Sequence, residues 1–255
     1  MPKVSVTIIT KNEAADIAAA LESVSWADER IVVDSCSTDD TVTIATRLGA
    51  RVASREWPGY VAQKNYAASL AANDWILSLD ADERVTSELA EEIRKTLEGE
   101  PESRGFWIPR VTFHLGRWIR TTDWYPDYQL RLYDRRAAEW TGTYVHEGVK
   151  VNGRVGRLRS ELQHYAYRDV AEHMETIDHY TTLAARQMFE HGRRATALDV
   201  TLQPAFAFFR NYILKRGFLD GSVGLTISKM NAQYVGLKFR KLRDLESRAA
   251  SPGPR

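Results

Sequence analysis

The sequence has a single cysteine and no long uninterrupted apolar segment. One cysteine cannot form an intrachain disulfide, which excludes a disulfide-stabilised scaffold and favours a reducing compartment. We expect Cys36 to be a small buried residue, because nothing beside it forms a Cys-His nucleophile pair. No window reaches the roughly 18 apolar residues that a membrane-spanning helix needs. Met1 to Lys3 leads directly into a strand-like segment, so we expect neither a secretory signal nor a membrane span.

An excess of charge of one sign is also missing, since 35 basic residues face 34 acidic ones and the net charge is +1. General nucleic-acid binders carry a marked basic excess, so we expect no nucleic-acid partner. The charge is nevertheless uneven, because residues 205–243 hold eight basic side chains and one acidic side chain, Asp220. The C-terminal segment therefore has its own electrostatic character.

The 255 residues are 44% hydrophobic, which is enough for a sizeable core. Over the first hundred residues, β-branched runs alternate with helical patterns, which is typical of βαβ units and a mainly parallel sheet. Further strands are expected after Gly105, including a hairpin around Asn152-Gly153. Helical patterns follow at 169–190 and at about 202–245. The fold class predicted is α/β with a C-terminal helical extension.

Acidic side chains follow the fourth expected strand, where Asp80-Ala81-Asp82 succeeds an apolar run. Two carboxylates one residue apart can share a hard divalent cation such as Mg²⁺ or Mn²⁺, which would neutralise a nucleotide diphosphate. The same triplet could also form a solvated turn. Thr10 and Asp34 end the first and second expected strands, and ligands of such sheets bind at the carboxyl ends of the strands.

Three segments in this order, TIITKNE, VVDSCSTDDT and LSLDADE, resemble the family 2 inverting glycosyltransferases of the GT-A fold, which is Rossmann-like with a mainly parallel sheet. The resemblance covers most of the first 150 residues. It implies a catalytic domain at 1–165, with a nucleotide-binding half at about 1–100 and an acceptor half at about 101–165. A basic helical extension would occupy 166–250, and 251–255 would be a disordered tail.

Carried over to this chain, the resemblance implies roles for six residues. Thr10, Glu13 and Asp34 would line the nucleotide base and ribose, and Asp80 would lie near the ribose and donor sugar. Asp82 would bind the Mg²⁺ or Mn²⁺ ion. The segment GYVAQKNYA would supply a basic side chain to the phosphates, Lys64.

Inverting transfer requires a base that takes the proton of the acceptor hydroxyl. The candidates are Glu147, which follows a late strand much as the family's Glu-Asp pair does, and Asp127. The pair here is His146-Glu147, which departs from the family pattern. The remaining candidates for contacts with acceptor or phosphate are two aromatic side chains, the histidine and one arginine, namely Trp124, Tyr125, His146 and Arg131. Arg131, with Arg135, could equally lie on the solvent face of its strand.

A closer resemblance runs through WYPDYQLRLYDRRAAEWTGTYVHEGV and GFLDGSVGLTISKMNAQYVGLKFRKL. These segments are similar to small enzymes that add glucose from UDP-glucose to the inner core of bacterial lipopolysaccharide. The likeness implies a UDP-sugar donor, a lipid-anchored saccharide acceptor and a cytoplasmic location, peripheral on the inner face of the cytoplasmic membrane. Another cell-surface polysaccharide or glycolipid pathway stays open, as does a noncatalytic nucleotide- or membrane-binding protein. A nucleotidyltransferase would need a glycine-rich loop after the first strand, and TIITKNE has no glycine.

The C-terminal region supports a membrane partner, because aromatic side chains such as Phe206, Phe209 and Phe218 alternate with Arg210 and Lys215. An interfacial helix on anionic lipid has this composition. The alternative is that the aromatic residues pack a helical appendage. Four other histidines match no compact metal-ligand spacing and are interpreted as structural: His164, His173, His179 and His191.

Overall fold

The computed structural model describes residues 2–99, 101–142, 147–167 and 169–250. The chain divides into two compact units, which are described separately. The first unit comprises Met1–Val111 and Asp127–His164, and the second comprises Thr112–Pro126 and Tyr165–Arg255. The C-terminal helices thus share their unit with a segment from the middle of the chain. The tail at 251–255 lies outside the described residues.

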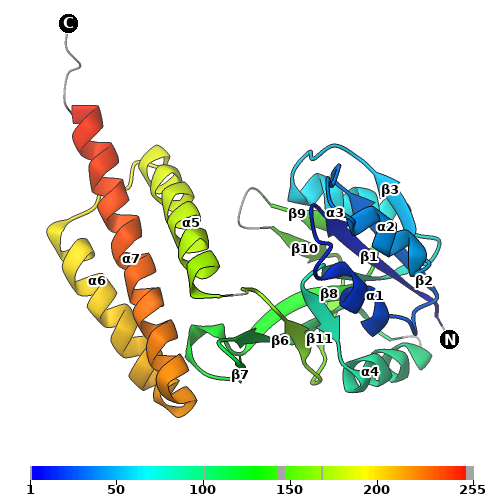
Figure 1. The fold of residues 1–255 in the computed structure, drawn as a ribbon. Helices are drawn as coiled ribbons and strands as arrows, with labels where there is room; N and C mark the ends of the chain where they lie inside the picture. Colours follow the sequence, from blue (N-terminus) through cyan, green and yellow to red (C-terminus); the bar gives the residue numbers. More distant parts are fainter. Residues whose placement is uncertain (1, 100, 143–146, 168, 251–255) are drawn as a thin grey trace, which may run out of the picture. The chain divides into compact units, whose positions relative to one another are not determined.

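The first unit is built on a mixed sheet whose N-terminal strands are parallel (Figure 1). Four parallel strands lie in the order β3-β2-β1-β4, and β8 and β6 continue the sheet in antiparallel pairing. Their bounds are β1 (Val4–Thr10), β2 (Glu29–Asp34), β3 (Arg51–Ser54), β4 (Trp75–Asp80), β6 (Ser103–His114) and β8 (Asp127–Asp134). The mainly parallel sheet expected in the first hundred residues is confirmed.

Helices cover both faces of this sheet, because successive side chains of a strand point to opposite sides. Val6 and Ile8 of β1 are fully buried in one apolar cluster with residues of three helices. Ile31 and Val33 of β2 are fully buried in a second cluster on the other face, together with a fourth helix. The first three helices are α1 (Ile17–Ser23), α2 (Thr41–Arg47) and α4 (Ser87–Glu98), and the fourth is α3 (Tyr60–Ser69).

Helix α4 has a capped N-terminus and a buried apolar face. The hydroxyl of Thr86 accepts a hydrogen bond from the backbone N–H of Leu89 at 3.1 Å, which caps the first turn. Leu89, Ile93 and Leu97 recur at helical spacing and are fully buried.

Residues 11–16 separate the end of β1 from the start of α1. Asn12 has a φ of 57°, which is left-handed rather than helical. Its side-chain oxygen accepts the N–H of Thr38 at 2.9 Å, and the N–H of Glu13 donates to Thr41 Oγ1 at 2.8 Å. These hydrogen bonds hold residues 12 and 13 against the loop that follows β2, so the helix starts only at Ile17.

The hairpin expected at Asn152-Gly153 is wrong. Strand β10 (Gly148–Val151) pairs with β9 (Ala138–Thr141), whereas β11 (Arg154–Arg157) pairs with β6. The N–H of Asn152 donates to the carbonyl of Ala137 at 2.7 Å, and Gly156 lies so close to Phe106 that a Cβ there would be 2.6 Å from the ring. Packing at these two places sends the strands to different partners. The remaining strands of this unit are β5 (Glu83–Val85) and β12 (Leu162–His164).

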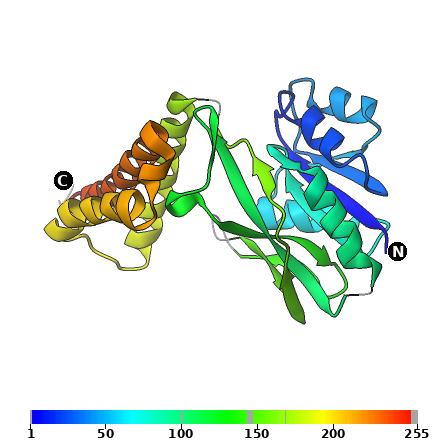
Figure 2. The same cartoon turned by 90° about the horizontal axis from the view of Figure 1, so that it is seen from below.

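The second unit contains three long helices, α5 (Val170–Glu190), α6 (Ala197–Phe209) and α7 (Gly221–Ala250), and Figure 2 views them from below. The expected helix at 169–190 is confirmed, with Asp169 accepting the N–H of Glu172 at 2.9 Å as its cap. The single helical region expected at about 202–245 is instead two helices. The break includes Arg216, with a φ of 57°, and a close approach at Gly224, where a Cβ would lie 1.9 Å from the Gly217 carbonyl oxygen.

Strand β7 (Arg117–Ile119) also belongs to the second unit, where it pairs with the last residues of β6. No helix among the described residues has both the length and the hydropathy of a membrane span. Cys36 is exposed, so the expectation that it is buried is wrong. It lies in the loop after β2 with a φ of 59°.

A buried histidine pair lies in the second unit. Nδ1 of His173 is 3.3 Å from Nε2 of His114, Trp124 packs against both rings, and Tyr167 stacks on His173 with ring centroids 4.1 Å apart. Burial, and secondarily the neighbouring His114, lowers the pKa of His173 from 6.5 to about 4. Burial also lowers the pKa of His114.

These shifts predict a loss of stability in mild acid. The unfolded chain protonates His173 near its ordinary pKa of 6.5, whereas the folded chain resists protonation down to about 4. The stabilisation is thus complete above pH 6.5 and declines as the pH falls, by up to about 3 kcal/mol. Urea unfolding at several pH values should show a shallower decline in His173→Gln than in wild type. His179→Gln, at an exposed position, should keep the wild-type slope, and equal slopes in all three would contradict the assignment.

Candidate active site

Three polar residues meet at the carboxyl ends of the parallel strands. The register pairs Thr10 with Asp34 and places Ile9 opposite Asp80. The hydroxyl of Thr10 donates to Asp34 Oδ1 at 3.0 Å, and both side chains are buried. The sequence-predicted residues Thr10, Asp34 and Asp80 therefore lie along one edge of the sheet.

The loop after β2 is fixed by its own polar side chains. Asp34 accepts the backbone N–H of Ser37 at 2.8 Å and the Ser37 hydroxyl at 2.5 Å. Gln63 reaches this loop from α3, where its amide donates to Ser35 Oγ at 3.1 Å. Its Oε1 is buried and has no hydrogen-bond partner in the described part of the chain. Glu13, whose backbone N–H donates to Thr41 Oγ1, is half-buried near this loop. Polar side chains therefore line the carboxyl ends of β1 and β2.

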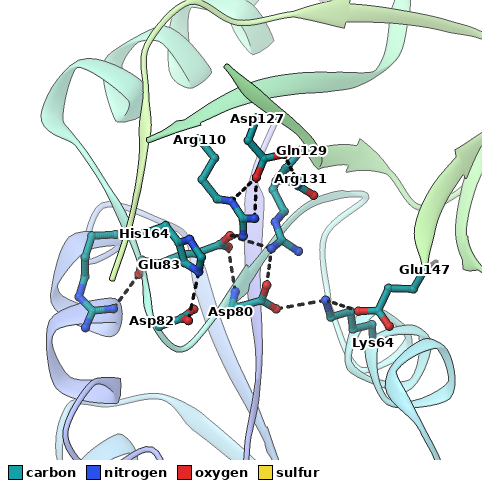
Figure 3. Close-up of polar contacts among 11 residues, drawn as sticks. Lys64, Asp80, Asp82, Glu83, Arg110, Asp127, Gln129, Arg131, Glu147 and His164 are labelled. Atoms are coloured by element: carbon teal, nitrogen blue, oxygen red, sulfur yellow. Dashed lines mark hydrogen bonds and ion pairs between the residues drawn. The ribbon is translucent and has the colours of Figure 1, made fainter. Parts of the chain in front are cut away.

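Lys64 joins two of the predicted acidic residues (Figure 3). Its Nζ is 3.1 Å from Asp80 Oδ1 and 3.2 Å from Glu147 Oε1. The ammonium group also lies 4.3 Å from the centre of a Trp140 ring, within the range of a cation–π contact. Helix α3, strand β4 and the chain before β10 thus contribute one side chain each to a single charged cluster.

Arg131 anchors the other side of Asp80. Its Nη2 contacts Asp80 Oδ2 and lies 2.7 Å from Glu83 Oε1. Burial by itself would raise the pKa of Asp80, but the charges of Arg131 and Lys64 hold this pKa well below its ordinary value. Burial would lower the pKa of Arg131, and Asp80 and Glu83 raise it instead. Both groups are therefore charged across the physiological range.

Glu83 extends the cluster to Asp127. Its Oε1 is 3.0 Å from Arg110 Nη1, and its Oε2 accepts the N–H of Asp80 at 3.0 Å. Arg110 in turn donates to Asp127 Oδ2 from Nε at 2.9 Å and from Nη2 at 2.6 Å. Gln129 donates to the other oxygen of Asp127 at 2.7 Å.

The two candidate bases differ in the state of their oxygens. Both oxygens of Asp127 accept hydrogen bonds from Arg110 and Gln129. In Glu147, Oε1 pairs with Lys64, whereas Oε2 is buried and has no hydrogen-bond partner among the described residues. A carboxylate oxygen without a donor is the better proton acceptor, so the geometry favours Glu147.

A cavity of about 290 Å³ opens among these residues. Its lining combines charged side chains with two aromatic ones that could stack on a sugar ring, Trp107 and Trp140. The charged and amide side chains that line it are Lys64, Asp80, Arg110, Gln129, Arg131 and Glu147.

Asp82 and His164 provide the donor atoms that suit a divalent metal. His164 Nε2 is 3.3 Å from Asp82 Oδ2, while Asp82 Oδ1 is buried and lacks a hydrogen-bond partner within the described residues. The described residues contain no group of three or more ligating side chains that could hold a metal alone. An oxygen without a partner beside an imidazole fits Mn²⁺ or Mg²⁺ whose other ligands are substrate phosphates and water.

The remaining predicted residues have different surroundings. Trp124 and Tyr125 belong to the second unit, where Trp124 is part of the aromatic and histidine cluster. Arg131 is buried rather than on a solvent face, and Arg135 donates to the carbonyl of Ala68 at 3.2 Å. His146 lies outside the described residues.

Sequence reasoning missed Glu83, Arg110 and His164, which all contact predicted site residues. Glu83 could have been noticed as a charged residue directly after the Asp80-Ala81-Asp82 triplet. Arg110 and His164 come from later strands and carry no local motif. Their contacts arise only from the pairing of distant strands.

We predict that Glu83→Gln destabilises the first unit. The variant leaves Arg110 and Arg131 facing a neutral amide, and breaking a buried ion pair costs about 3 kcal/mol. Urea unfolding should show this loss, while Glu91→Gln, on the exposed side of α4, should unfold like wild type. Equal stability of the two variants would mean that the cluster does not depend on the Glu83 charge.

Comparison with known proteins identifies the family of this chain. Residues 5–150 match the family model described as glycosyl transferase family 2. The chain is 34% identical over 258 residues to an uncharacterized glycosyltransferase of Rickettsia felis, which covers 96% of this chain and 90% of that protein. It is 28% identical over 255 residues to the lipopolysaccharide core biosynthesis glycosyltransferase LpsC of Rhizobium meliloti, over 97% of this chain and 94% of that protein.

Among solved structures, the mannosyltransferase PcManGT of Pyrobaculum calidifontis, in complex with GDP-Man and Mn²⁺, is 14% identical. It gives a TM-score of 0.55 over 95% of this chain and 87% of that chain, a likeness that concerns the fold alone. The architecture is the expected GT-A-like α/β fold with a C-terminal helical region. With the family model over more than half of its length and a relative above 30% identity along nearly all of it, the chain belongs to glycosyl transferase family 2.

Proposed function

We propose that this family 2 glycosyltransferase moves a hexose, glucose in the first place, from a UDP-sugar to a lipid-linked saccharide with inversion at the anomeric carbon. The observation that carries the proposal is the convergence of Lys64, Asp80 and Glu147 on one cavity at the carboxyl ends of the parallel strands. A cation for the phosphates, a carboxylate for the sugar and a carboxylate base then occupy one site.

The nucleotide would bind along the edge formed by Thr10, Glu13 and Asp34. The hydrogen bonds within the loop after β2 hold this edge in place before the donor arrives. Lys64 lies between two carboxylates that line the cavity, and its ammonium would pair with the diphosphate. The side-chain oxygen Oε1 of Gln63 has no hydrogen-bond partner among the described residues. Gln63 is therefore a further candidate for a contact with the nucleotide base.

The metal would be held by Asp82 with His164 beside it. When bound, Mg²⁺ or Mn²⁺ supplies charge neutralisation for the leaving diphosphate. Asp80 is engaged by Arg131 and Lys64, which leaves Asp82 as the carboxylate of the triplet with an uncommitted oxygen.

Glu147 would be the base of the transfer step. Its Oε2 would accept the proton of the acceptor hydroxyl while the hydroxyl oxygen attacks the anomeric carbon. The bond from the anomeric carbon to the diphosphate oxygen breaks, and its electron pair leaves with the diphosphate. Attack opposite the leaving group inverts the anomeric carbon. Arg110 and Gln129 would hold Asp127 in an orienting role.

The acceptor we propose is the inner core of lipopolysaccharide, at an anionic membrane surface on the cytoplasmic side. The similarity to LpsC over 97% of this chain supports a lipid-linked saccharide. Another cell-surface polysaccharide or glycolipid is the second candidate, since the relative is 28% identical. The presence of the whole charged cluster argues against a noncatalytic binding protein.

The first test is thermal stabilisation by a panel of nucleotide sugars with and without Mn²⁺. UDP-glucose at 100 times its dissociation constant should stabilise the fold by about 2.7 kcal/mol. A larger response to another nucleotide sugar would keep the reaction class and change the donor. The absence of any response would favour the noncatalytic alternative.

We predict that Asp82→Ala abolishes the metal-dependent part of this stabilisation. The carboxylate follows a strand end and has one oxygen without a hydrogen-bond partner in the described part of the chain, so its removal should leave the unliganded melting temperature close to wild type. Asp244→Ala, at an exposed position of α7, should respond to UDP-glucose and Mn²⁺ as wild type does. An undiminished manganese effect in Asp82→Ala would refute the metal assignment.

We predict that Glu147→Gln lowers kcat by about 100- to 10,000-fold while the donor KM changes little, because a general base acts mainly in the transition state. Asp127→Asn keeps an oxygen for Arg110 and should lose much less activity. Transfer from UDP-glucose to purified lipopolysaccharide acceptor, followed by release of UDP, measures both variants. The reverse order of effects would make Asp127 the base.

A further inference from the structure

Helix α6 in the second unit has a packed inner side. Val200 packs against the core shared by α5 and α7, and Pro204 lies close to Gly236 of α7, where a Cβ would be 3.3 Å from the proline ring. Ala207 and Asn211 are buried further along. These four residues are three or four positions apart, which is the spacing of a single helix face.

The opposite side of α6 is also apolar, yet it is exposed. Leu198, Leu202, Phe206 and Phe209 follow the same spacing, two positions out of phase with the inner side. At 3.6 residues per turn, this offset places them across the helix from α7. Their exposed fractions are 64%, 60%, 55% and 48%.

The exposed apolar surface continues beyond α6. Ile213, Leu214, Phe218 and Leu219 are exposed in the turns that lead to α7. We call these eight residues the outer face: Leu198, Leu202, Phe206, Phe209, Ile213, Leu214, Phe218 and Leu219. They are half of the sixteen large apolar side chains exposed among the described residues, although they occupy only residues 198–219. Such clustering marks an interaction surface.

The exposed charges within this segment are positive. Lys215 and Arg216 are exposed, and Arg210 is exposed and paired with Asp123. The acidic residue of the segment, Asp199, is buried and accepts hydrogen bonds from Thr196. Asp220, which follows the segment, is buried and paired with Arg117.

We infer that the outer face is a docking surface that inserts into an anionic lipid monolayer. Leucine and phenylalanine side chains would enter the boundary between headgroups and acyl chains, while Lys215 and Arg216 would contact lipid phosphates. A second copy of the chain fits less well. A symmetric dimer through this face would bring the cations of both copies together, and residues 198–219 expose no carboxylate to neutralise them.

The inference deepens the proposed function, on which it rests for the lipid-linked acceptor. It assigns the membrane partner to named side chains of α6 and the turns after it. Docking through one helix face requires no spanning helix, in agreement with the described helices.

The test is cosedimentation of the full chain with vesicles, without donor or acceptor. Wild type should sediment with vesicles of phosphatidylcholine and phosphatidylglycerol, and less with phosphatidylcholine alone. The triple variant Leu202→Ser, Phe206→Ser, Phe209→Ser should lose binding by about tenfold or more. Its melting temperature should stay near the wild-type value, since all three side chains are exposed.

The matched control is Val155→Ser with Val170→Ser, which changes two exposed apolar residues that are not part of the outer face and should bind as wild type. Lys215→Gln with Arg216→Gln should reduce binding to the anionic vesicles alone and lower its salt sensitivity. Equal binding of the triple variant and wild type would overturn the inference. Failure of the wild type to sediment with anionic vesicles would overturn it too.

Sedimentation velocity without vesicles separates the dimer alternative. A wild-type dimer that the triple variant converts to monomer would make the outer face a contact between copies and overturn lipid docking. Stabilisation by UDP-glucose and Mn²⁺ should be the same in wild type and the triple variant. If vesicle binding depends on the outer face while no nucleotide sugar binds, the docking surface stands and the proposed function fails.

Discussion

The carboxylate of Glu83 is fully buried between two guanidinium groups, those of Arg110 and Arg131, and also accepts the backbone N–H of Asp80. A charge in this setting is tolerated only while all its partners stay in place, because an unpaired ion in the protein interior is very costly. The three contacts come from β6, β8 and the end of β4. The pairing of these strands and the placement of Asp80 therefore depend on one another.

This constraint gives the two aspartates of the triplet different surroundings. Asp80 is held on one side by Arg131 and on the other by Lys64, so both of its oxygens are committed to cations within the protein. Asp82 lies two residues beyond the strand, where Oδ1 has no hydrogen-bond partner among the described residues and Oδ2 faces His164. Among the described residues, the ion pair of Asp82 is with the imidazole of His164 and not with an ammonium or guanidinium group. The same arrangement keeps Lys64 close to Glu147, so under the proposed function the donor and acceptor sides of the site would share a cation.

The sequence predicts those parts of the fold and site that rest on local patterns. Strand ends at Thr10, Asp34 and Asp80 follow from apolar runs that stop at polar residues, and parallel strands bring such ends to one edge. Contacts between distant strands have no such signal, which is why the roles of Arg110 and His164 were missed. The Asn152-Gly153 hairpin failed for a related reason, since the chain bends there but each flanking strand pairs with a different strand.

Helix α6 shows where composition alone stops being informative. Alternating aromatic and basic residues suit both an interfacial helix and a packed appendage, because both need apolar side chains on one side. The structure separates the aromatic residues by position: Phe208 and Tyr212 are half-buried and stack on each other at 5.5 Å, whereas Phe206 and Phe209 are exposed. A helix that packs through one side requires no leucine or phenylalanine on the other. Exposure of the outer face to water is therefore unfavourable, and packing against α7 does not relieve it. Because residues 198–219 expose no carboxylate, a negatively charged surface is the environment that would cover this face.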